Sequence, residues 1–345
     1  MHRRNLIKMS GVVAAIPLAA STARAAPACP SSSTVVWKRM ITPAANIPAL
    51  DGHADTVPDV VGRLGVPIAL AIFTEGNHFP ALLGGEIIEP FRAWAKRHPQ
   101  YATVPLDNIV VVTLPQPMIV AAIQGRGIAL GNLTLVVSRE NGFYPDIVMG
   151  GTAPLQALRK AGVVEPQARV FARNRGLSLL VAAGNPLAIS QLDDLARPDV
   201  RVVMASASEP GARAGYTSAL EGMLGREKTA SILAHETVTF PGRLGIQHRD
   251  VLQAIATRQA DVGIILRHLA SYYANTYPLL CDMVTVPGAE RFSSTLAMAT
   301  THQQLRAQAG KAFSEFFLRV AGEVYPRYEF ALMDKSEFGA AISLG

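Results

Sequence analysis

Apolar and polar positions follow two alternating patterns along most of the chain. Short continuous apolar runs predict strands over 67–73, 108–114, 147–149, 170–172, 177–182 and 200–204. Apolar residues at helical spacing predict helices over 81–96, 118–124, 154–161, 212–224, 251–258 and 307–320. The strand runs are apolar at every position, as in a sheet that helices cover on both faces. The pattern therefore predicts an α/β protein.

Three of these strands are followed by a polar turn and then a helix, over 67–96, 108–124 and 200–224. In an open parallel sheet such turns lie at the carboxyl ends of the strands, where ligands bind, and the helix N-termini there favour anions. The stretch 125–131 is rich in glycine but has the wrong spacing for a dinucleotide fingerprint, so we expect a loop.

The stretch 143–186 connects two halves of the chain. Its apolar runs Val170–Ala172 and Leu177–Ala182 are separated only by the polar segment Arg173–Gly176, with no helix between them. With 345 residues the chain exceeds one usual core, so two lobes are expected. Two strands joined in this way predict a hinge between the lobes.

Several segments carry a family resemblance in the same order along the chain. PDIV, AGVV, RVFARN and GNP in the stretch 143–186, then DDLARPDVRV and ADVGI, resemble the molybdate- and tungstate-binding group of periplasmic solute-binding proteins. The resemblance covers roughly residues 67–301. It implies an α/β, two-lobed type II periplasmic-binding fold, each lobe a mainly parallel sheet flanked by helices, with a hinge of two crossing strands. The domains we expect are an export signal at 1–25, an irregular extension at 26–65, lobe 1 at 66–175 and 285–345, and lobe 2 at 176–284.

The resemblance also implies a role for the protein and a set of site residues. It implies a monomer that captures a small oxyanion between its lobes and delivers it to an ABC permease and ATPase, without a cofactor. The expected donors, from side chains or from the backbone beside them, are Thr74, Asn77, Gln116, Ser206, Ser208, Arg213, Gln247, His248 and Arg267. Because a carboxylate is unfavourable next to an anion, Glu75 is expected to point away from the ligand or to have another role. The simplest interpretation of Glu75 and His78 is that both are solvated turn residues.

Two departures from the family pattern leave the ligand open. Pro115-Gln116-Pro117 stands where the family has small hydroxyl residues, and Leu266 stands where it has a tyrosine. Either Arg267 or Tyr272 then supplies the missing donor, or the ligand is another small anion, sulfur-containing or a carboxylate, held by Arg213 or Arg267. An exported sensory module or an enzyme on the same scaffold is the alternative of another class.

The first residues read as an export signal, with basic residues, an apolar core at 11–20 and the small-residue site Ala23-Arg24-Ala25. Arg3-Arg4 resembles a twin-arginine motif, and an ordinary secretory signal is the alternative. Cleavage removes four of the 32 basic residues and leaves 28 against 26 acidic ones. The mature protein is therefore nearly neutral, which argues against nucleic acid, and we expect it in the periplasm.

The two cysteines, Cys29 and Cys281, have no metal-ligand or redox spacing, so neither a metal nor a redox site is expected. They either pair with each other or stay separate, and Cys29 is also a weak match for a lipid-attachment site. The acidic and histidine residues of 51–55 are expected to form a solvated loop rather than a metal site. The chain lacks the motifs GxSxG, HExxH and GxxxxGK[ST], so we do not expect an enzyme.

Overall fold

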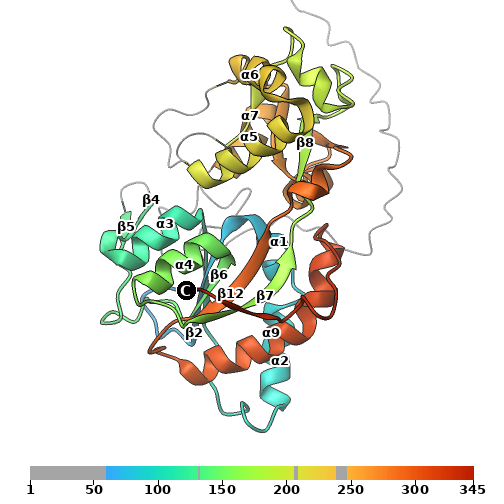
Figure 1. The fold of residues 1–345 in the computed structure, drawn as a ribbon. Helices are drawn as coiled ribbons and strands as arrows, with labels where there is room; N and C mark the ends of the chain where they lie inside the picture. Colours follow the sequence, from blue (N-terminus) through green and yellow to red (C-terminus); the bar gives the residue numbers. More distant parts are fainter. Residues whose placement is uncertain (1–59, 131–132, 206–208, 238–246) are drawn as a thin grey trace, which may run out of the picture. The chain divides into compact units, whose positions relative to one another are not determined.

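A computed structural model describes residues 60–130, 133–205, 209–237 and 247–345. All of these residues fall within one compact unit, which spans 35–345. They form a seven-stranded sheet, a four-stranded sheet and a small hairpin, with helices packed on the sheets (Figure 1). The expected signal peptide, most of the extension at 26–65 and Cys29 lie outside the described residues.

The first sheet has the strand order β1-β3-β2-β6-β12-β7-β13. The bounds are β1 Val60–Val61, β2 Leu70–Glu75, β3 Ile109–Leu114, β6 Ile147–Gly151, β7 Gln167–Arg173, β12 Thr295–Thr300 and β13 Ala341–Ser343. Only the β2–β3 and β2–β6 pairings are parallel. The expected mainly parallel sheet is thus a mixed one, because the chain leaves the sheet through β7 and returns beside it through the antiparallel strand β12.

The second sheet has the order β11-β8-β10-β9 and is also mixed. Its strands are β8 Leu177–Ala182, β9 Val202–Val203, β10 Val262–Leu266 and β11 Cys281–Thr285, and only β9 and β10 pair in parallel. The hairpin β4 Ile128–Leu130 and β5 Leu133–Leu135 lies in and beyond the stretch expected to be a loop.

Nine α-helices are described. They are α1 Phe79–Leu83, α2 Ile88–Arg97, α3 Gln116–Ala121, α4 Thr152–Lys160, α5 Pro210–Leu224, α6 Arg226–Ala234, α7 Gln247–Ala256, α8 Arg267–Thr276 and α9 Ala307–Arg327. The single helix expected at 81–96 is two helices, because Gly84 and Gly85 end the first and Gly85 has a φ of +100°. The short helices η2 Gly76–His78, η3 Ala122–Arg126, η4 Leu192–Ala196 and η5 Ala289–Phe292 complete the fold. Among the described residues no helix combines the length and apolarity needed to cross a membrane.

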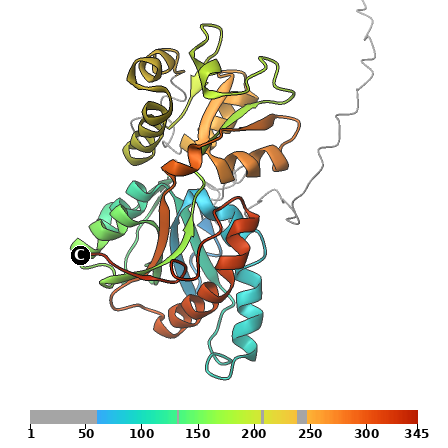
Figure 2. The same cartoon turned by 45° about the vertical axis from the view of Figure 1, so that its right-hand side comes forward.

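Helices cover both faces of the first sheet, which explains its continuous apolar strands (Figure 2). Side chains alternate along β2, so Leu70 and Ile72 pack with α2 and α9 while Ala71 and Phe73 pack with α3 and α4. Phe91 of α2 and Phe313 of α9 meet edge to face at 5.3 Å between ring centroids.

Two segments carry the chain between the sheets, residues 174–176 and residues 286–294, and they are hydrogen-bonded to each other. Oδ1 of Asn174 accepts hydrogen bonds from the backbone N–H of Gly176 at 3.1 Å and of Ser294 at 3.0 Å. The N–H of Asn174 donates in turn to the carbonyl of Ser294 at 3.0 Å. One asparagine therefore ties the outgoing segment to the returning one.

Cys281 is a free thiol buried at the start of β11. Burial, reinforced by the nearby Asp282 carboxylate, raises the pKa of Cys281 to about 12. Because only the thiolate is a strong nucleophile, this protonated cysteine is unreactive at neutral pH.

Candidate functional site

A cavity of about 470 Å³ lies among the ends of strands from both sheets. The turns after β2, β3 and β6 contribute residues 75–77, 115–117 and 151–154. The N-terminal part of α5, the end of β10, part of α8, the two connecting segments and the ends of β3, β8 and β12 also contribute to the lining. This is the edge where polar turns follow the strands, as the sequence pattern indicates.

Helix N-termini open onto this cavity. Its lining includes Gly151 and Thr152 at the start of α4, Gly211 and Ala212 at the start of α5, and Leu266 directly before α8. Each helix N-terminus presents backbone N–H groups and a partial positive charge of roughly half a unit. The cavity can therefore receive the oxygens of an anionic group.

Gln116, the first residue of α3, lies against the glycine pair that ends β6. A Cβ placed on Gly150 would overlap Nε2 of Gln116, and one on Gly151 would lie 3.3 Å from its Oε1. The glycines thus leave the space that the Gln116 amide fills. Asn77 also lines the cavity, and its buried Oδ1 has no hydrogen-bond partner among the described residues. The structure brings these two predicted residues to one cavity.

Two carboxylates also line the cavity. Glu75, at the end of β2, is 9% exposed, and Glu209, directly before α5, is 6% exposed. Neither side chain caps its own helix. Oε2 of Glu75 accepts a hydrogen bond from the N–H of Gly151 at 3.3 Å. The described lining contains these two acidic residues and no lysine or arginine.

Tyr216 of α5 lies near both carboxylates. Its hydroxyl accepts a hydrogen bond from the N–H of Leu266 at 3.0 Å. Burial first, and then the negative charges of Glu209 and Glu75 among smaller causes, hold the pKa of Tyr216 well above its usual value. Tyr216 therefore stays a neutral phenol in the wall of the cavity.

Thr74 does not line the cavity. Side chains alternate along β2, so Thr74 points to the opposite face from Glu75 and is fully buried. Its hydroxyl is hydrogen-bonded to Nε2 of His78, whose Nδ1 lies 2.8 Å from the hydroxyl of Tyr325. Burial lowers the pKa of His78 to about 3, so this ring is neutral at physiological pH. The expectation of solvated side chains at Glu75 and His78 is wrong, because both are buried.

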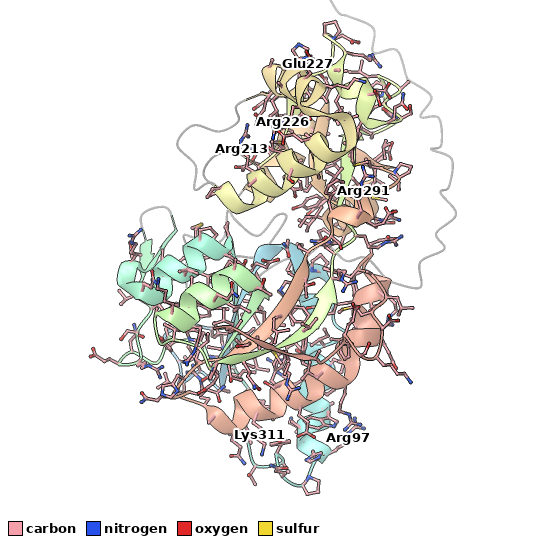
Figure 3. The ribbon with its side chains drawn as sticks, in the orientation of Figure 1. Arg97, Arg213, Arg226, Glu227, Arg291 and Lys311 are labelled. Atoms are coloured by element: carbon pink, nitrogen blue, oxygen red, sulfur yellow. The ribbon has the colours of Figure 1, made fainter. Side chains whose placement is uncertain are left out.

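The two predicted arginines lie outside the cavity lining and are held in ion pairs. Arg213, near the start of α5 (Figure 3), donates from both terminal nitrogens to Glu236 at 2.7 Å, and its pKa is raised chiefly by that hydrogen-bonded pair. Nε of Arg267 lies 2.9 Å from Oε2 of Glu329, which Arg175 also contacts at 3.0 Å. Both arginines are therefore engaged by carboxylates of the protein in this arrangement.

Four other predicted residues stand at or beyond the ends of described segments. Ser206 and Ser208 lie outside the described residues, and Gln247 and His248 are the first two residues of α7. The acidic and histidine residues of 51–55 are likewise outside. Among the described parts of the chain no group of three or more His, Cys, Asp or Glu residues is arranged to hold a metal.

Sequence reasoning did not single out Glu209, Tyr216, Tyr273, Asn174 or Ser294, which all line the cavity. The sequence could have indicated Glu209 as a site residue, because it stands in the polar turn between β9 and α5, where a ligand contact is expected. Tyr216 and Tyr273 lie inside helices, where the apolar periodicity places an aromatic residue in the core.

This chain has two larger sheets with helices packed on them, two connecting segments and a cavity at the ends of the strands. These features define the two-lobed type II class of solute-binding proteins. The sequence profile described as bacterial extracellular solute-binding protein matches residues 82–323, more than half of the chain. The chain belongs to this family.

Solved structures support the same fold. The sulfate-binding protein SubI of Mycobacterium tuberculosis H37Rv is similar at a TM-score of 0.53 and 18% identity, over 79% of this chain and 88% of that one. The periplasmic molybdate-binding protein of Azotobacter vinelandii gives 0.50 and 15%, over 77% and 100%. The ferric binding protein of Campylobacter jejuni gives 0.50 and 15%, over 80% and 93%. A search of functionally curated proteins gave no match.

Proposed function

We propose that this chain is an exported solute-binding protein that captures a small solute with an oxyanion group and delivers it to an ABC importer. One observation carries the proposal: the N-termini of α4 and α5, which follow strands of different sheets, open onto the same cavity. Backbone N–H groups at helix N-termini bind anions without a full counter-charge. The family supports the transport role, and the permease and ATPase are the partners that this role requires.

The neutral donors in the cavity wall support recognition of oxygen atoms. The side-chain amides of Asn77 and Gln116 lie at the turns after β2 and β3, and the hydroxyl of Ser294 lies in the returning segment. Such donors select a ligand by hydrogen-bond geometry rather than by charge. They would hold the oxyanion while the helix N-termini stabilise its charge.

A molybdate- or tungstate-like oxyanion is the ligand that the family resemblance favours. Two of the similar solved structures are a sulfate-binding and a molybdate-binding protein, which agrees with a ligand of this kind. Glu75 and Glu209 favour a second candidate, a small organic anion, because two buried carboxylates repel a bare dianion. A carboxylate ligand held by a guanidinium loses its support, since Arg213 and Arg267 are paired elsewhere.

We also propose that residues 66–175 with 285–345, and residues 176–284, act as two lobes that close on the solute. The sheet membership of the strands supports this division, because β8 to β11 form a sheet of their own. Closure would bend the connecting segments and give the permease a shape that signals a bound solute.

Export to the periplasm completes the proposal and rests on the predicted signal at residues 1–25 and on the extracellular family. If the twin-arginine route is used, an Arg3→Lys, Arg4→Lys variant should leave the precursor in the cytoplasm. Normal export of that variant would show that another route serves this protein.

A thermal-shift screen tests the proposed binding directly. Molybdate, tungstate, sulfate, phosphate and small carboxylates should be added to the purified mature protein. A true ligand at one hundred times its dissociation constant stabilises the folded state by about 2.7 kcal/mol. Stabilisation by one of these anions, with none from chloride at equal ionic strength, is the expected result. If no anion, inorganic or organic, raises the unfolding temperature, anion capture is contradicted.

A further inference from the structure

We propose that the solute carries an ammonium group beside its oxyanion group, and that Glu75 and Glu209 bind this ammonium group. The inference rests on the proposed function, because it names the solute class that the same cavity takes. A zwitterionic organic solute, rather than a bare inorganic dianion, is then the ligand.

The charges around the cavity carry the inference. The N-termini of α4, α5 and α8 contribute roughly half a positive charge each, about +1.5 together. Against them stand two carboxylates, Glu75 and Glu209, and no lysine or arginine in the described lining. A dianion would add two further negative charges to a site whose own charges nearly cancel. A zwitterion leaves that balance unchanged and pairs each of its charges with an opposite one.

The position of the carboxylates makes them ligand groups rather than surface charges. Both are buried, and both line the same cavity as Tyr216. Neither caps the helix that it precedes. Glu75 binds the N–H of Gly151 through Oε2, and a carboxylate has about four lone-pair sites in all, so it can accept from a ligand as well.

The size and walls of the cavity also fit an organic solute. About 470 Å³ falls in the range of sites for small organic ligands, and it exceeds the needs of one tetrahedral ion. Leu177, Leu269, Phe292 and Leu296 supply apolar wall on several sides. These side chains would bury the carbon skeleton between the charged ends of a zwitterion.

Matched probes isolate the ammonium group. Calorimetry should compare 2-aminoethylphosphonate with ethylphosphonate, 4-aminobutyrate with butyrate, and both pairs with molybdate and sulfate. In the wild type we expect the amine to strengthen binding at least tenfold in one pair, as a hydrogen bond between charged groups does, at about 1.4 kcal/mol per tenfold. That preference should shrink to below threefold in Glu75→Gln and Glu209→Gln variants.

Glu227→Gln serves as the control, because this glutamate lies on α6 (Figure 3) and is not among the residues that line the cavity. It should keep the wild-type preference, and unfolding temperatures should show that all variants are folded. Tight binding of molybdate or sulfate with no preference for either amine overturns the inference and leaves the proposed function standing. Binding of none of the six probes overturns the inference, and it overturns the proposed function as well if the wider anion screen also finds no ligand.

Discussion

The backbone N–H of Gly151 donates a hydrogen bond of 3.3 Å to Oε2 of Glu75. A carboxylate of the protein thus stands at the N-terminus of α4, where a helix favours negative charge. A site for a bare oxyanion would leave that position to the ligand. In this protein Glu75 already neutralises part of the positive charge at the helix N-terminus, so the ligand charge that the site favours depends on Glu75 as well.

We predict that Gly150→Ala destabilises the protein mainly through backbone strain, because residue 150 has a φ of 152°. A Cβ at residue 150 would also overlap Nε2 of Gln116, the far end of a flexible side chain that can move aside, and would lie 3.2 Å from Oε2 of Glu75. Strain of this kind costs about 1–3 kcal/mol. Urea unfolding should show this loss.

The Gln116→Ala background provides the control for that variant. It removes the overlapping side chain, so Gly150→Ala should still cost more than half as much there, since the backbone strain and the Glu75 contact remain. Loss of most of the cost in that background would assign the destabilisation to Gln116 instead.

A second prediction concerns the pH dependence of stability. His78 has a pKa of about 3 in the folded protein, because it is buried, and about 6.5 when unfolded. Between these values the unfolded chain binds the additional proton, so the free energy of unfolding falls as the pH is lowered through this window. From pH 7 to pH 5 this histidine alone should remove about 2 kcal/mol.

Chemical denaturation at a series of pH values checks the histidine. His78→Gln should flatten the slope between pH 5 and pH 7, whatever its effect on absolute stability. His302→Gln is the control, because His302 is exposed on the surface beside Glu165. An unchanged slope in His78→Gln would assign the acid sensitivity to other groups.

A third prediction is that ligand binding moves the hinge, expected in Phe171–Leu177 and Met283–Pro287. In the structure Phe171–Arg173 belongs to β7 and Met283–Thr285 to β11, so bending should be confined to 174–176 and 286–294. Small-angle scattering should show a smaller radius of gyration at ligand saturation. An Asn174→Ala variant, which loses the hydrogen bonds between the segments, should shift the radius of the empty protein. Identical radii in all four states would contradict closure through these segments.

Sequence reasoning reached the fold because the strands and helices follow clear periodic patterns. The apolar runs near β2, β3 and β8 and the amphipathic run of α9 were placed correctly to within a few residues, except at the end of α9. Strand direction was not accessible, because an antiparallel strand such as β12 has the same apolar pattern as a parallel one.

The site was less accessible than the fold, for reasons that single residues show. Asn77 and Gln116 were predicted because they stand in turns after strands, and both line the cavity. Thr74 was misplaced by one position, and one position reverses the face of a strand. Arg213 and Arg267 could bind a ligand only if no carboxylate of the protein paired with them. Arg213 pairs with Glu236 and Arg267 with Glu329, and both glutamates are too far away in sequence for these pairs to be predicted.

The most direct measurement for the central claim is ligand stabilisation of a variant with a filled cavity. Gly215 of α5 lines the cavity, and a Cβ built there has no other heavy atom within 4 Å, so Gly215→Leu can place a side chain in the open space. Ala214→Leu, one residue away and outside the lining, is the matched control. In a thermal-shift assay with molybdate, sulfate, phosphate and 2-aminoethylphosphonate, the account predicts stabilisation of the wild type and of Ala214→Leu by at least one probe. It predicts none for a folded Gly215→Leu, and equal stabilisation of both variants would contradict binding in this cavity.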